Sequence, residues 1–229
     1  MKRVADIREQ FAELRKKAKY VGNTIEIVGE SFIADEPLIF GAVNHAYVSR
    51  EIQWYQSHSL SVDDIPGDTP KIWKQVAGVN GRINSNYGYL FESIMNGSQL
   101  DHVIHHLSRD KNTRRAVAIY TRPSMHNDWN SDGMSDFVCT NAVQFLIRDG
   151  LLDLVVQMRS NDAIFGYRND YAWHRYCQDL VIGTLAHTYD IHVGKGDIIW
   201  NAASLHIYDR HMFLIDDYAL HGNIEGTVS

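Results

Sequence analysis

The stretch MRSNDAIFGYRND, which ends at Asp170, has the richest chemistry in the chain. It places a cation, a hydroxyl, two carboxylates and a glycine in one turn-rich run between a strand-like and a helix-like segment. Such a mixture does not suit an apolar core, where unpaired polar groups are costly to bury. It suits an anionic ligand that forms several hydrogen bonds, and Arg159-Ser160 supplies donors that fit a phosphate.

Cys139, just before a predicted strand pair, is a candidate nucleophile. A free cysteine is more often a small buried hydrophobe. With an ordinary pKa of about 8.5, only a few per cent of a cysteine is thiolate at neutral pH, so a reactive one needs cations nearby. The chain offers Arg159 and the pair Arg114-Arg115. Cys177 falls inside a helical pattern with no such cations near it in the sequence, and it is interpreted as structural.

Arg114-Arg115 stands at the start of an apolar strand, where a solvated loop is the ordinary interpretation. Adjacent guanidinium groups at a strand entrance also suit a phosphate dianion, because each fork offers two parallel donors. His206 and Tyr208 place two hydrogen-bonding rings on one face of a strand, either as a structural pair or as part of a ligand site. The sequence contains no paired Cys/His motif and no His-Glu-x-x-His segment, so no metal site is predicted.

Hydrophobic spacing predicts helices and strands in irregular order. Helices are expected at residues 3–19, 46–57, 70–73, 100–107 and 170–189, and strands at 24–29, 116–120, 142–148, 151–158, 198–201 and 204–208. The remainder of residues 67–88 is expected to be irregular. Asp149-Gly150 is a two-residue hairpin signal, and Glu51 lies on the apolar stripe of its helix, an unusual place for a carboxylate. This mixture without a regular βαβ order favours the α+β class.

Length and composition favour one sizeable domain over residues 1–229. A net charge of −6 and a pI near 6.0 give no general cationic surface, so no direct nucleic-acid binding is expected. The first residues run into a charged amphipathic segment and not into an apolar signal core. No apolar run approaches the roughly 20 residues that span a bilayer, so no membrane association is expected. Two cysteines make no disulfide framework, and a cytoplasmic protein is predicted.

Taken in chain order, these residues resemble the thymidylate synthase family over nearly the whole sequence. The motifs are Glu51 with Trp54-Tyr55, Ile72-Trp73, Asn86-Tyr87-Gly88, Thr113-Arg114-Arg115, Cys139 before Gln144-Phe145, Arg159-Ser160-x-Asp162, Gly166 and His206-x-Tyr208. Within the family, residues 32–37, 120–125, 132–137 and 165–173 are most similar to bacteriophage enzymes that hydroxymethylate deoxycytidylate. The resemblance implies a thymidylate synthase-like fold, with helices packed on a mixed sheet and a homodimer formed through the sheet face.

The resemblance also implies a role for each site residue. Cys139 adds to C6 of the pyrimidine, and Glu51 is a buried general acid/base that also orders water. The substrate-binding residues are Arg159 and Ser160 on the phosphate, Arg114 and Arg115 reaching the partner's phosphate across the dimer, His206 and Tyr208 on the sugar 3′-hydroxyl, and Asn169. The residues against 5,10-methylenetetrahydrofolate are Trp73, Asp162 and Gly166. Whether the tail at residues 222–229 closes over the folate stays open.

Several positions depart from the family pattern. Thr140 stands where a histidine follows the nucleophile, and Met158 stands where a glutamine precedes the Arg-Ser pair. No clear equivalent of the family's N-terminal phosphate-binding arginine occurs near residues 29–35. Asp170 stands where the family has the asparagine that reads uracil.

The chemistry of Asp170 favours cytosine. An asparagine amide donates to O4 of uracil and accepts from N3–H. Cytosine instead presents an amino donor at C4 and an acceptor at N3, and a carboxylate accepts from the amino group and from N3–H once N3 is protonated. Because thiolate addition to C6 moves electrons toward N3, Asp170 stabilises charge that grows during the reaction. The alternative interpretation is that Asp170 caps the following helix.

The predicted reaction is transfer of a one-carbon unit from 5,10-methylenetetrahydrofolate to C5 of dCMP with hydration, giving 5-hydroxymethyl-dCMP. Three alternatives stay open. A dCMP C5-methyltransferase would use the same residues and yield dihydrofolate, and a CMP hydroxymethylase would differ only around the ribose 2′-position. The third alternative is a non-catalytic nucleotide-binding or RNA-binding regulator on the same fold.

Overall fold

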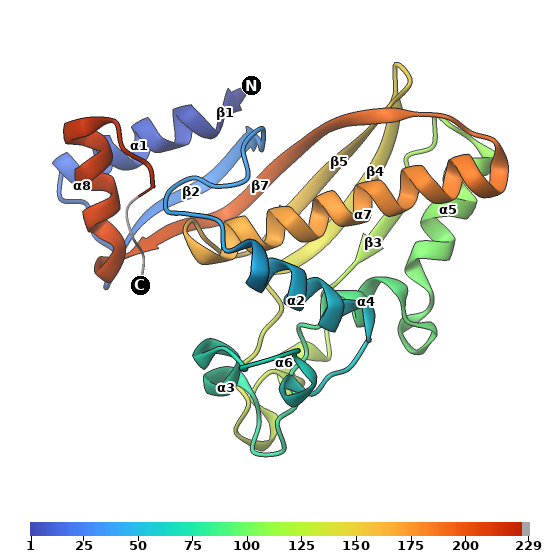
Figure 1. Cartoon of the computed structure of the whole chain (residues 1–229), viewed down its shortest axis with the longest axis horizontal. Coiled ribbons are helices and arrows are strands. Elements are labelled where there is room, and N and C mark those ends of the chain that lie inside the picture. Colours follow the sequence, from blue (N-terminus) through green and yellow to red (C-terminus); the bar gives the residue numbers. More distant parts are fainter. Residues whose placement is uncertain (226–229) are drawn as a thin grey trace.

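The computed structural model describes residues 1–225, and its centre is a mixed β-sheet (Figure 1). The strand order is β1-β2-β7-β5-β4-β3, with β6 beside β7. The strands are β1 (Lys2–Arg3), β2 (Thr24–Ile33), β3 (Val117–Ile119), β4 (Thr140–Arg148), β5 (Leu151–Met158), β6 (Asn161–Asp162) and β7 (Gly194–Tyr208). Strands β5 and β6 run parallel to β7, whereas β2 with β7 and β4 with β5 are antiparallel. The predicted mixed sheet of an α+β fold is therefore confirmed.

Helices cover the sheet and its ends. They are α1 (Val4–Lys16), α2 (His45–Gln56), α3 (Lys71–Val76), α4 (Tyr87–Glu92), α5 (Gln99–Arg109), α6 (Met125–Asp128), α7 (Phe165–Tyr189) and α8 (Met212–His221). The longest, α7, lies across the sheet and contacts β5 and β7, while α1 and α8 pack together at the β2 end (Figure 1). The hydrophobic pattern predicts α1, α2 and α5 to within a few residues but does not predict α4, α6 or α8.

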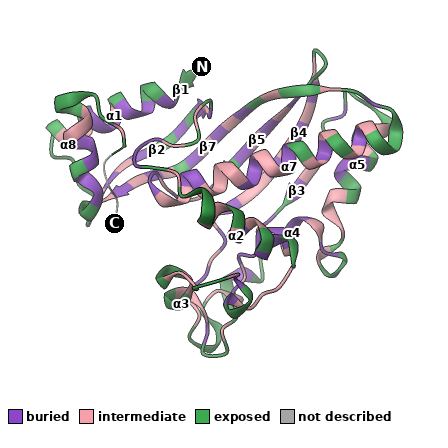
Figure 2. Cartoon of the chain, in the orientation of Figure 1, coloured by how far each residue is buried: buried purple, intermediate pink, exposed green. Residues whose placement is uncertain are grey.

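The core is one cluster of buried residues from the sheet and from the helices packed on it, and Figure 2 shows buried positions along both the strands and α7. In β4 the side chains of Val143, Phe145 and Ile147 are buried, and the residues between them are partly exposed. Burying a large aliphatic or aromatic side chain contributes about 1.5–3 kcal/mol. A slip of one residue would turn this whole row toward solvent, so burial fixes the register of the strands.

The β4–β5 hairpin brings the candidate nucleophile to its cation. Asp149 and Gly150 both have positive φ, 50° and 77°, as a two-residue type I′ turn requires. The resulting register pairs Thr140 with Met158. Cys139 and Arg159, the next residues outward on each strand, therefore lie side by side.

Gly88 explains why α4 packs so closely on α2. A Cβ atom at this position would lie 1.9 Å from the carbonyl oxygen of Tyr55, so only glycine permits the contact. Asn86 begins the helix, because its side-chain oxygen accepts from Tyr89 N at 2.8 Å and its amide donates to Trp54 O at 3.0 Å. The prediction of an irregular segment up to residue 88 is thus wrong at its end.

The start of α7 also differs from the prediction. The helix begins at Phe165 and not at Asp170, because Asp162 accepts hydrogen bonds from Ile164 N at 3.1 Å and Phe165 N at 3.2 Å. These two bonds satisfy amide groups that the first helical turn leaves without partners. Asp170 therefore lies inside the helix, and the interpretation of this residue as a helix cap is wrong.

Candidate active site

Cys139 is held at the start of β4 by a buried network. The carboxylate of Asp136 accepts from Asn84 N at 2.6 Å, from Ser85 N at 2.8 Å and from the Ser85 hydroxyl at 2.6 Å. Arg159 N donates to Cys139 O at 2.9 Å, and Nη2 of the same arginine lies 3.7 Å from Cys139 Sγ. Cys139 as a residue is partly exposed.

Two opposing effects act on the Cys139 thiol. Burial in a weakly polar setting raises its pKa to about 11. The guanidinium of Arg159 opposes this rise, whereas the carboxylates of Asp170 and Asp136 add to it. Arg159 is thus a cation close enough to the sulfur to favour its thiolate form. The charge of Asp170 thus acts on the Cys139 sulfur.

Asp170 projects from the second turn of α7 with its carboxylate held on one side. Asn161 Nδ2 donates to Asp170 Oδ2 at 2.8 Å. Burial raises the pKa of Asp170 well above its ordinary value, and the negative charge of Glu51 raises it further. The hydroxyl of Tyr87 and the amide of Asn161 act in the opposite direction and favour the ionised form. A carboxyl balanced in this way can hold or release a proton next to a bound base.

Glu51 forms a second buried carboxyl close to the first. Its Oε1 accepts from the Tyr47 hydroxyl at 2.6 Å and from Trp73 Nε1 at 3.2 Å. Burial raises its pKa to about 7, although Tyr47, Trp73 and the charge of Arg168 lower it. This pKa is suitable for a general acid/base near neutral pH, and the structure explains how a glutamate comes to lie on an apolar helix stripe.

Most of the residues predicted to hold phosphate and sugar lie near the ends of β5, β6 and β7. Ser160 directly precedes β6, and Asp162 in β6 is the register partner of His206 in β7. The rings of His206 and Tyr208 lie on one face, 5.2 Å apart and at 90°. Arg159 already donates through Nε to Val138 O at 2.9 Å, which fixes the direction of its guanidinium group.

Arg114 and Arg115 are not part of this cluster within one chain. Both side chains are exposed, and the pairing of Val117 with Gln144 places them near the far end of β4. The strand rises about 3.3 Å per residue, so Arg115 lies roughly 20 Å from Cys139 along it. Of the two sources of cations that the sequence offers, Arg159 is therefore the one next to Cys139 of the same chain.

Two residues predicted to lie against the folate, Asp162 and Gly166, are near the start of α7. The third, Trp73, donates a hydrogen bond to Glu51. A Cβ atom on Gly166 would lie 3.3 Å from both Asn161 Nδ2 and Asp162 Cβ. Asp162 uses one lone pair of each carboxylate oxygen in starting the helix, which leaves others for a ligand. Trp73 is half-buried, and Asn169 has a buried Oδ1 without a partner in the described residues.

Two departures from the family pattern prove to be neighbours. The Thr140 hydroxyl donates to the Tyr87 hydroxyl at 3.0 Å and lies 3.2 Å from Met158 Sδ. Thr140 is fully buried, so a larger side chain there needs a different residue at position 158. Neither contact, nor the bond from Asn161 to Asp170, is visible in the sequence, because each joins residues through strand pairing and helix packing.

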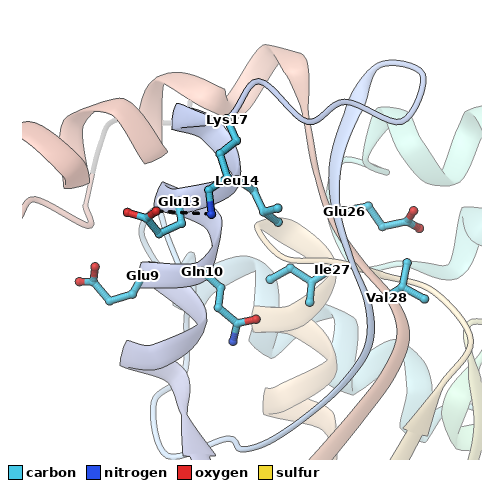
Figure 3. A pocket seen from close by; sticks show the side chains of 8 residues that line it. All are labelled: Glu9, Gln10, Glu13, Leu14, Lys17, Glu26, Ile27 and Val28. Carbon is cyan, nitrogen blue, oxygen red and sulfur yellow. Dashed lines mark ion pairs between the residues drawn. The ribbon is translucent and has the colours of Figure 1, made fainter.

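A separate groove of about 460 Å³ lies between α1 and β2 (Figure 3). It is lined by Glu9, Gln10, Glu13, Leu14, Lys17, Glu26, Ile27 and Val28. None of the predicted site residues lines this groove, and its three glutamates do not suit a phosphate. Across residues 1–225 there is no cluster of three or more potential metal ligands. None of the described helices has the length and apolar character needed to cross a membrane.

Known proteins share this arrangement of strands and motifs. The family model described as thymidylate synthase matches residues 37–221. Proteins named deoxycytidylate 5-hydroxymethyltransferase from Enterobacteria phages T4 and T6 are each 55% identical to the chain, and the matches cover 85% of the chain and 80% of each relative. A solved structure of thermostable thymidylate synthase A from Bacillus subtilis has a TM-score of 0.69 at 18% identity, covering 98% of this chain and 86% of that chain.

The structural likeness confirms the predicted fold. The family match spans most of the chain, and its range includes every predicted site residue from Glu51 to Tyr208. The chain therefore belongs to the thymidylate synthase family.

Proposed function

We propose that this chain is a deoxycytidylate 5-hydroxymethyltransferase, acting as one catalytic domain in the cytoplasm of a phage-infected host. It would transfer a one-carbon unit from 5,10-methylenetetrahydrofolate to C5 of dCMP, and hydration would give 5-hydroxymethyl-dCMP. The names of the phage relatives support this substrate and product. The observation that carries the proposal is an acidic residue, Asp170, whose charge helps to raise the pKa of the Cys139 thiol.

Cys139 begins the reaction by forming a bond from sulfur to C6 of the base. The Arg159 guanidinium, 3.7 Å from the sulfur, favours the thiolate as the thiol proton leaves. Addition breaks the C5–C6 double bond and makes C5 nucleophilic. Elimination of the same sulfur restores the aromatic base at the end of the cycle.

Asp170 recognises cytosine and balances the charge at N3. Because burial raises the pKa of this carboxyl well above its ordinary value, it can hold the proton that N3 takes up when sulfur adds to C6. In the protonated form its hydroxyl donates to N3 and its other oxygen accepts from the 4-amino group. After proton transfer the carboxylate accepts from both groups, so the contact strengthens as charge develops.

Glu51 would manage the water and protons at C5. With a pKa of about 7, it can take the C5 proton and can hold the water that completes the hydroxymethyl group. When bound, methylenetetrahydrofolate supplies the carbon at the oxidation level of formaldehyde. Trp73, Asp162 and Gly166 would hold this cofactor, and the residues fit it: a half-buried indole, a carboxylate with free lone pairs and a position without a side chain.

The rest of the nucleotide would lie along the ends of β5, β6 and β7. The phosphate would contact Arg159 and Ser160 of one chain, and His206 with Tyr208 would bind the 3′-hydroxyl. Asn169 would also face the substrate. Arg114 and Arg115 would reach the phosphate in the other subunit of a homodimer, which their distance from Cys139 of the same chain supports.

Mass spectrometry of the product from dCMP and methylenetetrahydrofolate tests the reaction directly. A gain of CH₂O supports hydroxymethyl transfer, whereas a gain of CH₂ with rising absorbance near 340 nm would identify a methyltransferase. Purified protein should release tritium from [5-³H]dCMP, and Cys139→Ala should not. Lack of C5 exchange in the wild-type protein would favour a non-catalytic nucleotide-binding role, and faster turnover of CMP would favour a ribonucleotide enzyme.

Substitution of the base-reading residue tests the choice of substrate. Asp170→Asn restores an amide that donates to O4 of uracil and accepts from N3–H. We expect kcat/KM for dCMP to fall and exchange of the C5 hydrogen of dUMP to appear. Unchanged discrimination between dCMP and dUMP in this variant would contradict the role of Asp170.

A further inference from the structure

We propose that Asn161 is a positioning residue that sets the preference for cytosine by holding the carboxylate of Asp170. This inference rests on the proposed function, because it concerns recognition of the same base. Asn161 lies in β6, is 2% exposed, and donates through Nδ2 to Asp170 Oδ2 at 2.8 Å. This hydrogen bond fixes the direction of the Asp170 carboxylate.

The pair is fixed by its surroundings. Asn161 is the register partner of Leu205 in β7, so sheet pairing sets its backbone. The first turn of α7 closes over the pair, because a Cβ atom on Gly166 would lie 3.3 Å from Asn161 Nδ2 and 3.8 Å from Asp170 Oδ2. The absence of a side chain at residue 166 therefore protects this hydrogen bond.

The oxygen of the Asn161 side-chain amide indicates that the hydrogen bond to Asp170 is functional. Its Oδ1 is buried and has no hydrogen-bond partner among the described residues. An unsatisfied buried acceptor destabilises the folded protein, and leucine has nearly the same shape without that cost. A residue needed only for packing would be better as leucine. An asparagine is expected here if its N–H group is needed by Asp170.

The side-chain N–H group of Asn161 is important because acidic groups also act on Asp170. Glu51 and Asp162 are acidic and disfavour ionisation of Asp170, while Tyr87 and Asn161 favour it. An ionised carboxylate is an acceptor only, so it pairs with cytosine once N3 has taken up the proton, and it repels O4 of uracil. Asn161 thus supports the form of Asp170 that separates the two bases.

The test compares Asn161→Leu with the wild-type protein by calorimetric titration with dCMP and with dUMP, without folate. We expect dCMP affinity to fall roughly tenfold or more, since hydrogen bonds to charged groups contribute about 1.5–3 kcal/mol. Affinity for dUMP should change less than about twofold, and Tm should stay the same or rise. The control is Asn96→Leu, which removes a partly buried amide that donates to Leu90 O at 2.8 Å. It should lower Tm and keep the preference for dCMP.

A second background separates positioning from general damage. In Asp170→Asn, the added Asn161→Leu change should alter dCMP affinity by less than about twofold, because the charged partner is already gone. Equal losses in both backgrounds, or an unchanged preference in Asn161→Leu alone, would overturn the inference and leave the proposed function intact. A wild-type protein without preference for dCMP over dUMP would overturn both.

Discussion

At the scale of single residues, protonation of Glu51 affects both the stability of the fold and the proposed acid/base chemistry. Its folded pKa of about 7 lies above the ordinary value of 4.5 because burial penalises the charge. Folding therefore favours the protonated form. The stabilisation from this group is complete below about pH 4.5 and is lost as pH rises through about 7.

Glu51→Gln should remove this pH dependence. The amide keeps an acceptor for the Tyr47 hydroxyl but never ionises, so at pH 8 the variant should melt a few degrees above the wild-type protein. At pH 5 the two proteins should melt at nearly the same temperature. Turnover should fall by about 10²-fold or more. Thermal melts between pH 5 and 8 measure the first effect, and a difference in Tm that does not grow with pH would contradict it.

The Cys139 thiol offers a second residue-scale prediction. Because burial raises its pKa to about 11, alkylation by iodoacetamide should be slow at neutral pH and should keep rising with pH beyond 9. Arg159→Gln removes the nearby cation and should slow alkylation further at every pH. Cys139→Ser is the control for labelling at fully buried Cys177 and should take up no reagent in the folded state. A plateau in the rate below pH 8 would show that the thiol is far more acidic than the structure indicates.

At the scale of elements, the start of α7 is a place where the sequence motif predicts a functional site but the local pattern does not predict the helix. Gly166 and the polar run around Asp170 look like a loop in sequence, so the predicted helix begins five residues late. The structure joins that loop-like segment to the helix because Asp162 caps it. Helix propensity cannot reveal this arrangement, since the capping contact and the packing against β6 outweigh the cost of a glycine.

Local signals succeeded where one short segment determines the geometry. Asp149-Gly150 forms the predicted turn, because positive φ at two successive residues needs little help from tertiary structure. Contacts between segments that are distant in the sequence could not be predicted from local patterns. The Thr140–Met158 contact and the bond from Asn161 to Asp170 depend on strand register and helix packing. The family motifs nevertheless single out Cys139 and Asp170, and in the fold the charge of Asp170 acts on the Cys139 thiol.

Two glycines of α7 give a matched test of this element. An alanine in a helix interior is ordinarily about 0.5–1 kcal/mol more stable than glycine. Gly183 has open space where its Cβ atom would be, so Gly183→Ala should raise Tm by a few degrees and leave turnover unchanged. At Gly166 the new atom would press on Asn161 and Asp162 at 3.3 Å. Gly166→Ala should therefore gain no stability and should weaken the preference for dCMP.

Thermal melts and competition between dCMP and dUMP distinguish the two glycine variants. Equal gains in Tm for both would mean that the start of α7 yields without disturbing the Asn161–Asp170 pair. That result would remove the structural reason for glycine at residue 166.

At the scale of the whole molecule, the two faces of the sheet differ in burial. In β5 the side chains of Leu152, Leu154 and Val156 are fully buried, whereas Val155 between them is only partly buried and Leu151 is 44% exposed. A face with apolar side chains that the chain itself does not bury suits a twofold interface with a second copy. This is the homodimer that we propose, and it gives the exposed Arg114-Arg115 pair a site to reach.

Hybrid dimers test whether those arginines act across the interface. Cys139→Ser and Arg115→Ala homodimers should each be nearly inactive. After unfolding and refolding an equal mixture, half of the dimers combine both chains, and each hybrid has one site with intact Cys139 and an intact arginine from its partner. Activity should therefore return to about a quarter of the wild-type value, as random pairing in a twofold dimer requires. If Arg115 served the Cys139 of its own chain, the hybrids would contain no complete site and the mixture would stay inactive. Sedimentation of each protein before and after mixing confirms that dimers are present in every sample.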